Sequence, residues 1–564
     1  MLRLYAALGA IAVGIWAFHS VETWHSWLTA IIAGLFLFLV RVHNRLSDKI
    51  QMLQLHLSVI VNELQALQGN CSAFADGAAY IDIAHPYSYD LDIFGKGSVY
   101  QSVCRVVTVG GASLLAGKLS SLVREKEDIT GRQEIIKELS TQPDLLQNFR
   151  VAGIAIAEGP EDQVFLTRWL QEKDLFINNT VIRVAAVLMP VLSIACLLWS
   201  VFIGALYPGL SLLVIVNWVL LISFQKNIKL AAGQIDNRAK FIDKYECLLK
   251  QMAAPGFKNG WLQNTSANAT SSLDNIAALK KLVHLFESRS NAIVGMLMNT
   301  FFLFDFYCLL RLETWRRKYR QSLLTAIGAV IEMDVYVSCG VYAFNHPENI
   351  YADIAAGNEL YAKDLRHPLL SPTAAVGNDF SLGAKEQFYL LTGANMTGKS
   401  TFIRTVGVSI VLSNIGLPLP ARELSMPLLK LYTSMRITDS VQDDISYFRA
   451  ELNRIRIIMD KVCTSQQSYL VLLDEPLRGT NSTDKQQGTR AIVETLLTYN
   501  TIGIIATHDT GLCDMATKHP GKVSNYHFES KVEPGGLSFD FLLKPGGSTS
   551  NNATILMRQM GIIR

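Results

Sequence analysis

Apolar residues gather in two long blocks in the first half of the chain. The first block is interrupted, and its two parts, residues 4–18 and 27–40, are each shorter than the roughly 20 residues that a membrane-spanning helix needs. The second block, residues 184–224, contains no Asp, Glu, Lys or Arg, and a Tyr-Pro-Gly turn signal at 207–209 divides it. The pattern therefore predicts two helical hairpins, the second at about residues 181–224.

Lys and Arg residues flank both predicted hairpins, whereas the short loops between the paired helices carry none. The flanking cations are Arg3, Arg41, Arg45 and Lys49 for the first hairpin, and Lys173, Arg183, Lys226 and Lys229 for the second. By the positive-inside rule, four transmembrane helices would place both termini in the cytoplasm, as in an integral protein of the inner or plasma membrane. A cleaved signal peptide is the alternative for the first block, and a buried core hairpin for the second.

Helical periodicity dominates the rest of the chain up to about residue 345. After a first unit at 1–75, residues 76–345 are predicted to form an all-α region, a helical core and lever that the second hairpin interrupts. We expect the polar stretch NTSANATSS at 264–272 to be a loop within this region. In the first unit, apolar residues recur in alternating steps of four and three, at Leu46, Ile50, Leu53, Leu57, Ile60, Leu64 and Leu67. This heptad seam could pair with a copy of itself or pack against helices of its own chain.

Composition narrows the class of protein. The net charge is only +3 over 564 residues, which gives no global sign of a nucleic-acid-binding protein. The eight cysteines are scattered without a C-x-x-C pair, which is typical of a reduced cytosolic body and not of a disulfide framework or a zinc site. One local cluster, TWRRKYRQ at 314–321, mixes four cations with two aromatic residues. A solvated helix face is the ordinary interpretation of this cluster, and a nucleic-acid patch is the alternative.

Short apolar strands alternate with helical segments after about residue 346, which predicts an α/β domain over 346–564. Residues 393–400 fit the phosphate-loop motif G-x-x-x-x-G-K-[ST], with a strand-like segment before them and a helix-like segment after them. Backbone N–H groups of such a loop point at phosphates, while Lys399 would reach the β- and γ-phosphates and Ser400 would bind Mg²⁺. The predicted ATP-binding residues of this segment are Gly393, Ala394, Asn395, Met396, Thr397, Gly398, Lys399, Ser400 and Thr401.

Two further strand-like segments end in polar residues. SYLVLLDEP contains Asp474, placed to hold Mg²⁺ through water, and Glu475, which would point to the opposite face and orient the attacking water. IGIIATHD contains His508, which could touch the γ-phosphate. This order is the layout of an ABC-type ATPase, whose sites usually close between two subunits. The sequence therefore predicts an α/β P-loop (ABC-type) ATPase domain with ATP and Mg²⁺ as cofactors. Its catalytic residues would be Lys399, Glu475 and His508, and its metal-binding residues Ser400 and Asp474.

Four motifs connect this domain to a known family. TGANMTGKST, DDISYFRAEL, LLDEPLRGTNSTD and IIATHD resemble, in order and spacing, the ATPase domain of the MutS family of DNA mismatch-repair proteins. The likeness is dense over residues 360–564, where LRHPLL is similar to the entry motif and GSTSNNATILMRQMGI to the C-terminal segment. Upstream, DIFGKGSVYQSV and GRQEIIKEL resemble the family's helical core and lever domain. The whole layout resembles a membrane-anchored branch of that family.

The resemblance implies roles for three further residues. Ser446 would contact the γ-phosphate held by the partner subunit, Asn395 would belong to the phosphate loop, and Asn378 would lie near the adenine. The resemblance also implies hydrolysis of ATP to ADP and phosphate, a homodimer that closes through the nucleotide sites, and double-stranded DNA as a candidate partner.

The sequence departs from the family at several points. Val376 offers no aromatic ring where the family often stacks the adenine, and we find neither a mismatch-reading domain with a Phe-x-Glu wedge nor a nuclease domain. The second hairpin lies where the family's DNA clamp would be inserted. We therefore expect a membrane-anchored ATPase that is related to mismatch repair but lacks its reading domain. The alternative is an ATP-driven membrane-remodelling or scaffold ATPase that does not bind DNA. Because the hairpins carry few polar residues besides Asn217, no transported substrate is inferred.

Overall fold

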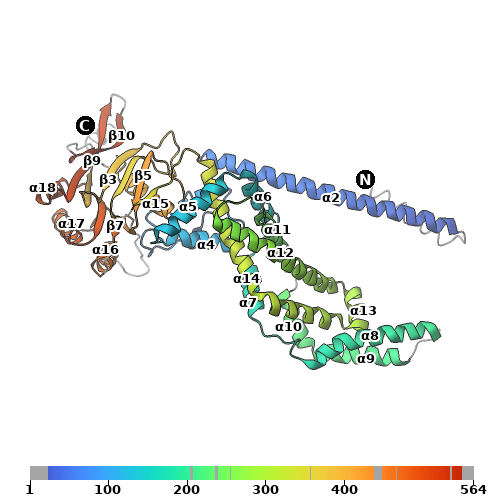
Figure 1. Cartoon of the computed structure of the whole chain (residues 1–564). Coiled ribbons are helices and arrows are strands. Elements are labelled where there is room, and N and C mark those ends of the chain that lie inside the picture. Colours follow the sequence, from blue (N-terminus) through green and yellow to red (C-terminus); the bar gives the residue numbers. More distant parts are fainter. Residues whose placement is uncertain are drawn as a thin grey trace.

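The computed structural model describes residues 23–203, 208–235, 239–254, 256–355, 357–394, 396–436, 447–464, 467–533 and 536–548. Three parts follow one another along the chain: a projecting N-terminal helix, a large all-helical body and a C-terminal region with two β-sheets (Figure 1). Among the described residues, this order agrees with the predicted all-α part followed by an α/β part.

The N-terminal helix α2 (Thr23–Leu67) projects away from the C-terminal region (Figure 1). Only its C-terminal part packs on the helical body. There the carboxylate of Glu63 pairs with the guanidinium groups of Arg105, at 2.7 Å, and of Arg150, at 2.6 Å. These contacts attach one end of α2 to the body and leave the rest of the helix standing clear of it.

The helical body contains most of the helices predicted between residues 76 and 345. They are α3 (Val99–Val103), α4 (Val109–Ser120), α5 (Lys126–Ser140), α6 (Pro143–Ile154), α7 (Pro160–Gln171), α11 (Ala239–Met252), α12 (Gly260–Glu287) and α14 (Phe304–Asn345), with 3-10 turns at η1 (Ala78–Tyr80) and η2 (Ser288–Ser290). The expected loop at 264–272 is wrong, because these residues lie inside α12. Thr265, Ala269 and Ser272 are buried there, and their small side chains let α12 pack closely against its neighbours.

The long helix α14 is the axis of the helical body, because α4, α5, α6, α11 and α12 all pack against it. Asp334 in α14 is fully buried. Its carboxylate accepts hydrogen bonds from the N–H groups of Val107 (3.0 Å) and Thr108 (2.8 Å) and from the Thr108 hydroxyl (2.6 Å). Burial raises the pKa of Asp334 to about 6. This one side chain therefore attaches the start of α4 to the axis of the body.

A bundle of apolar helices lies at the end of the body remote from the C-terminal region (Figure 1). It consists of α8 (Thr180–Ile203), α9 (Pro208–Ser223), α10 (Gln225–Ile235) and α13 (Ala292–Phe302). α8 and α9 coincide with the predicted second hairpin, and α13 packs against both of them. Their exposed side chains include Val187, Trp199, Phe202, Leu212, Ile222, Ile293 and Met296.

Length and composition alone would let two of the described helices, α8 and α14, cross a membrane, and the bent pair at 209–223 and 225–233 would be a third if it forms one span. Burial separates the two long helices. In α14, 67% of the apolar window is buried inside the protein, compared with 22% in α8. Packing between helices thus accounts for the apolar character of α14, whereas α8 exposes its apolar side chains. Of the first predicted hairpin, 4–18 lies outside the described residues, and 27–40 is part of α2.

The C-terminal region contains a four-stranded and a six-stranded sheet. The smaller sheet has the order β1-β5-β2-β3, with β1 (Asp353–Ala355), β2 (Leu360–Leu365), β3 (Asn378–Leu382) and β5 (Glu423–Pro427). The larger has the order β10-β9-β4-β8-β7-β6, with β4 (Phe388–Thr392), β6 (Lys430–Ser434), β7 (Tyr469–Asp474), β8 (Thr501–Ala506), β9 (Val523–Glu533) and β10 (Gly536–Pro545). The helical elements are α15 (Lys399–Asn414), α16 (Tyr447–Cys463), α17 (Ser482–Leu496), η3 (Thr510–Asp514) and α18 (Met515–Lys518).

The middle of the six-stranded sheet is parallel. β4 lies between β8 and β9, β7 lies between β8 and β6, and only β10 runs antiparallel to its neighbour β9. Every residue of β4, β7 and β8 is buried, which explains their continuous apolar sequences. Parallel strands end at the same edge of a sheet, so the residues that follow β4, β7 and β8 come together there.

One apolar core joins the helical body to the C-terminal region. Asp90, in the segment before α3, is buried and accepts hydrogen bonds from residues at the end of β6. The donors are the Thr433 hydroxyl (2.6 Å) and the N–H groups of Met435 (3.2 Å) and Arg436 (2.9 Å). These contacts position the six-stranded sheet against the helical body.

Asp334→Ala is expected to lower the free energy of unfolding by about 3 kcal/mol, because it leaves the N–H groups of Val107 and Thr108 without their acceptor. Thermal unfolding of the purified protein measures the loss. Gln321→Ala, at an exposed position of the same helix, is the control and should change stability by less than about 0.5 kcal/mol. Equal stabilities of the two variants would contradict the role of Asp334.

The raised pKa of Asp334 also predicts a pH dependence. Because the folded-state pKa of about 6 lies above the ordinary value of 3.8, the contribution of this group is fully present below about pH 4 and is lost as the pH rises through 6. Asp334→Asn cannot titrate, so its unfolding temperature should lack this part of the decline. Unfolding curves of both proteins between pH 4 and 7 test the difference.

Candidate functional site

The segment between β4 and α15 is a tight loop that two glycines make possible. Gly393 has φ 141° and Gly398 has φ 104°, both in the region that favours glycine. A Cβ atom at Gly393 would lie 2.8 Å from the carbonyl oxygen of Phe528, and one at Gly398 would lie 3.0 Å from the ring of Phe541. Met396, at the tip, is 77% exposed. The loop therefore wraps closely and opens its tip to solvent.

Lys399 is the first residue of α15, and its side chain turns back into the loop. Its Nζ donates hydrogen bonds of 2.7 Å to the carbonyl oxygens of Gly393 and Ala394. The Lys399 side chain is buried, and this burial lowers its pKa. An ammonium group has three donors, so one N–H remains for an anion at the loop. Thr397 also stabilises the loop, through a hydrogen bond of 2.9 Å from its hydroxyl to Ala394.

Ser400 and Asp474 bring the loop and the end of β7 together. The Ser400 hydroxyl donates to Oδ2 of Asp474 at 2.7 Å. The other carboxylate oxygen, Oδ1, is buried and accepts no hydrogen bond from any described residue. A hydroxyl and a carboxylate with an unused oxygen are the hard donors that Mg²⁺ prefers, and Mg²⁺ usually takes only one or two protein ligands beside phosphate and water. These two residues therefore fit a magnesium ion.

Glu475 follows Asp474 and meets His508 at the end of β8. Its backbone has φ 51°, which is unusual for a residue other than glycine. Nε2 of His508 forms a very short contact with Oε1 of Glu475, and Nε of Arg478 lies 3.3 Å from Oε2. The pKa of Glu475 is lowered to about 2, mainly by the hydrogen bond from His508. Burial acts in the opposite direction and would raise this pKa, whereas the charges of His508 and Arg478 lower it further. Glu475 is therefore ionised at neutral pH.

Three of the residues that organise this site were not predicted from the sequence. Arg478 lies between the acids, 3.5 Å from Asp474 and 3.3 Å from Glu475. Glu451 of α16 is buried, and its Oε1 accepts a 2.6 Å hydrogen bond from the N–H of Leu477, which connects α16 to the loop after β7. Both residues lie within motifs of the sequence, Arg478 in LLDEPLRGTNSTD and Glu451 in DDISYFRAEL. The motifs did not show, however, which partners these side chains have.

Phe541 is the third residue that the sequence did not reveal. The Asn378 amide donates to the carbonyl oxygen of Phe541 at 3.1 Å, and Asn378 Oδ1 accepts from the N–H of Leu543 at 2.6 Å. These bonds tie β3 to β10 and hold the aromatic ring against Gly398. The side chain of Asn378 thus positions an aromatic residue beside the loop. The sequence had suggested that no aromatic ring is available, because Val376 is not aromatic.

Asn395 and Ser446 lie outside the described residues. Thr401 is exposed on the first turn of α15. The structure brings together the loop with Lys399 and Ser400, the two acids at the end of β7, and His508 after β8.

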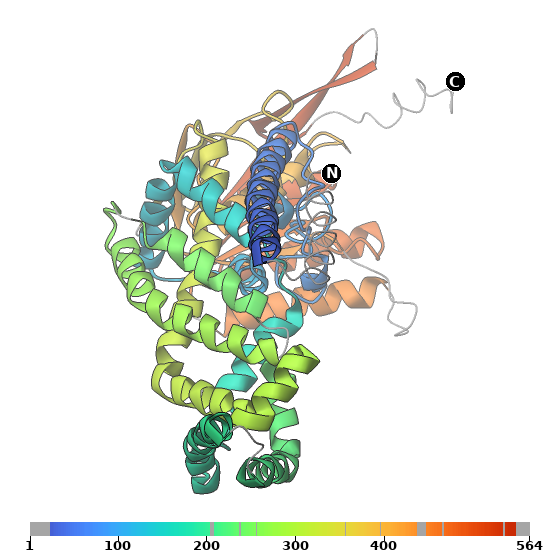
Figure 2. The same ribbon diagram turned by 90° about the vertical axis from the view of Figure 1, so that its right-hand side faces the viewer.

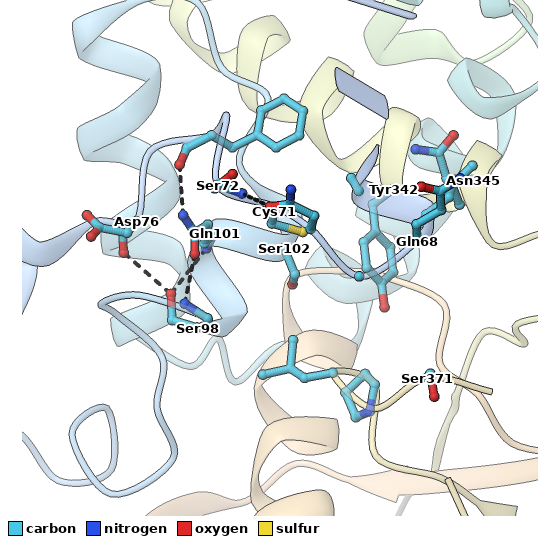
Figure 3. Close-up of a pocket in the computed structure, with 18 of the residues that line it drawn as sticks. Gln68, Cys71, Ser72, Asp76, Ser98, Gln101, Ser102, Tyr342, Asn345 and Ser371 are labelled. Atoms are coloured by element: carbon cyan, nitrogen blue, oxygen red, sulfur yellow. Dashed lines mark hydrogen bonds between the residues drawn. The ribbon is translucent and has the colours of Figure 1, made fainter. Parts of the chain in front are cut away.

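A separate cavity of about 930 Å³ lies where the end of α2, the end of α14 and residues 368–372 meet (Figure 3). None of the predicted nucleotide-site residues lines it. Several of its polar groups bond to one another, since Gln101 donates to the Phe74 carbonyl at 3.0 Å and accepts from Gly97 at 2.7 Å. These hydrogen bonds hold together the loops that line the cavity.

The basic cluster at 314–321 is divided by the structure. Arg316 is buried and donates to Asp174 at 2.8 Å and to the Trp169 carbonyl at 3.0 Å. Arg317, Lys318 and Arg320 are exposed on α14. Only the exposed cations are therefore available to an external partner.

The fold and site define a class: an α/β protein whose polar site lies where parallel strands end and a glycine-containing loop begins a helix. Residues 389–561 match the family model described as MutS domain V. The chain is 31% identical over 255 residues to the DNA mismatch repair protein MutS of Thermus thermophilus, which is 45% of this chain and 30% of that protein. It is 29% identical over 240 residues to the MutS of Natronomonas pharaonis, 42% of this chain and 27% of that protein.

A third relative, the MutS of Thermotoga sp. (strain RQ2), is 32% identical over 228 residues, 40% of this chain and 28% of that protein. The chain thus spans less than a third of the length of these relatives. The C-terminal part of the chain is MutS-like, and these matches support the resemblance to the MutS family seen in its motifs. Membrane anchoring is no part of these matches and stays a prediction.

Proposed function

We propose that this protein is a Mg²⁺-dependent ATPase that hydrolyses ATP to ADP and phosphate, with the MutS-like region as its motor. One observation carries the proposal: the Ser400–Asp474 hydrogen bond leaves a buried carboxylate oxygen free beside a loop that contains Lys399. The adjacent Glu475 and His508 supply the groups that hydrolysis needs.

Each residue has a chemical task in this proposal. The N–H groups of the loop and the Nζ of Lys399 bind the phosphates of ATP. Ser400 and Asp474 hold Mg²⁺, which neutralises charge on the phosphates when it is bound. The ionised carboxylate of Glu475 orients water, and His508 holds this carboxylate and faces the γ-phosphate. The ring of Phe541 offers an aromatic surface to the base.

The proposed active form is a homodimer that closes through its nucleotide sites. By resemblance, Ser446 of one subunit contacts the γ-phosphate held by the other. The start of α16 follows this serine closely, and Glu451 of α16 holds the N–H of Leu477, two residues after Glu475. A contact by the partner at this point would therefore reach the catalytic loop through α16.

We further propose that the protein is anchored in the inner or plasma membrane by four helices, with both termini and the ATPase region in the cytoplasm. The apolar side chains that α8 and α9 expose support this placement. The free end of α2 and the α8–α9 bundle project on the same side of the molecule, so that one flat bilayer could receive both (Figures 1 and 2).

DNA is the partner proposed from the relatives, which are DNA mismatch repair proteins. The exposed cations Arg317, Lys318 and Arg320 support an electrostatic contact with phosphates. The alternative, a membrane-remodelling or scaffold ATPase, is supported by α14, which runs unbroken from the apolar bundle to the C-terminal region. A movement of the ATPase region would be transmitted through α14 to the apolar helix bundle.

Glu475→Gln should bind ATP normally but turn it over at least about 100-fold more slowly, because the uncharged amide cannot orient water as a carboxylate does. Nucleotide binding and phosphate release, measured on the same preparation, separate the two effects. Glu494→Gln, a half-exposed glutamate on α17, is the matched control and should be unaffected. Hydrolysis at the wild-type rate by Glu475→Gln would show that another group is the catalytic carboxylate.

Lys399→Ala should instead lose ATP affinity, because this residue contributes a charged donor to the phosphates.

Topology is tested with reporters that respond to the side of the membrane. A reporter at Ser26 or Pro208 is expected outside the cytoplasm and one at Arg564 inside, because Lys and Arg flank the hairpins on the cytoplasmic side. An extracytoplasmic signal from Arg564 would refute the proposal, since the ATPase region would be separated from ATP.

If DNA is the partner, the full chain in detergent should retard duplex DNA with a steep dependence on salt. Replacing Arg317, Lys318 and Arg320 with Gln should make this dependence shallower by up to about three in the slope of log affinity against log salt. Replacing the exposed Lys126, Lys258 and Lys385 serves as the control for total charge. Absence of binding at low salt would favour the remodelling or scaffold alternative.

A further inference from the structure

Seven apolar residues form a continuous stripe along the C-terminal half of α2, which we call the α2 seam. They are Leu46, Ile50, Leu53, Leu57, Ile60, Leu64 and Leu67, and their exposed fractions range from 46% to 69%. Their alternating steps of four and three keep them on one side of the helix over about three heptads. Among the described residues, this stripe is exposed along its whole length.

The opposite side of α2 is the one that contacts the helical body. Val59 is buried there, and Leu55, Asn62 and Ala66 are half-buried. At 3.6 residues per turn, these positions lie roughly 130–170° around the helix from the centre of the seam. Figure 2 shows α2 almost end-on, projecting toward the viewer in front of the body. The seam is therefore left open, although α2 also packs against helices of its own chain.

The surroundings of the seam argue against lipid as its cover. Four charged residues, Arg41, Arg45, Asp48 and Lys49, surround the helix where the seam begins. Farther along α2, the positions outside the seam include polar amide side chains, namely Gln51, Gln54, Asn62 and Gln65. A helix that crosses a bilayer would have to bury these groups, whereas a partner helix covers the seam alone.

We propose that a second copy of this chain covers the seam, so that two α2 helices form a parallel, two-stranded coiled coil. Heptad spacing specifies a partner helix with the same spacing, and the second copy supplies it. With Ile50, Leu57 and Leu64 at the a positions, the flanking pairs of a parallel dimer are Lys49–Gln54, His56–Val61 and Glu63–Gln68. None of these pairs brings like charges together.

The contacts of Glu63 limit the assembly to two helices. Glu63 borders the seam, and its carboxylate is held by Arg105, Arg150 and the amide of Asn345, which donates at 2.9 Å. Bundles of three or four helices bury the residues on both borders of the seam. Because the Glu63 side chain is bonded to the helical body of its own protomer, a further helix cannot pack on this border. The seam therefore has room for one partner helix.

This dimer does not depend on nucleotide, in contrast to the closure proposed for the ATPase regions. It would keep two ATPase regions at a high effective concentration, so that ATP binding need only close them. The parallel orientation rests on the proposed membrane anchor, because all copies of a membrane protein point the same way. Pairing of the seams itself does not rest on the anchor or on ATP hydrolysis.

Cysteine cross-linking of the full chain in membranes, without nucleotide, tests the pairing. Leu46→Cys lies at one end of the seam and should link to the same introduced cysteine of a second copy at least about fivefold more than Gln51→Cys, an exposed position off the seam. Equal linkage of the two variants overturns the proposal. Linkage of Leu46→Cys to Leu67→Cys in mixed membranes, in place of same-site linkage, overturns the parallel orientation.

Sedimentation of the detergent-solubilised chain gives a second readout. Lys399→Ala removes the nucleotide-driven dimer, and in this background the protein should remain a dimer. Adding Leu53→Lys and Leu57→Lys should shift it to a monomer at the same concentration, whereas the control pair Gln51→Lys and Gln65→Lys should not. If the Lys399→Ala protein is already a monomer, the proposal is overturned. It is also overturned if the protein remains a dimer after Leu53 and Leu57 are replaced. Neither result bears on ATP hydrolysis.

Discussion

The contact between α4 and α14 through buried Asp334 is the constraint on which the rest of the structure depends. α14 is the longest helix of the body, and it reaches from the apolar bundle to the start of the C-terminal region. Its buried carboxylate takes three donors from the start of α4, and a group at this depth cannot exchange them for bulk solvent. The axis that results connects the apolar bundle of α8, α9, α10 and α13 to the proposed motor.

The candidate site depends on a second constraint, the parallel order of β4, β8 and β7. This order places a glycine-containing loop, two acids and a histidine at one edge of the sheet. Local contacts then refine the site, because His508 and Arg478 keep Glu475 ionised while Asp474 retains an unused oxygen. α16 and β10 add Glu451 and Phe541 from outside the central strands.

Some features could not be predicted because they depend on what surrounds a residue. The polar run at 264–272 suggested a loop, but its small side chains are those that fit between packed helices. Arg316 belonged to a basic cluster in the sequence, yet its partner Asp174 is 142 residues away. The heptad seam left two partners open, and only the packing of Val59 showed that the body uses the other side.

By itself, the sequence determined the features that are local in the chain: the apolar blocks, the heptad spacing, the phosphate-loop motif and the polar ends of two strands. Periodicity and short motifs depend on neighbouring residues, so they can be read without a fold. The tertiary structure decided which distant groups meet, as in Asn378 with Phe541, Glu451 with Leu477 and Asp334 with Thr108. Such pairs form because buried polar groups must find partners, and only the folded chain determines which partners are within reach.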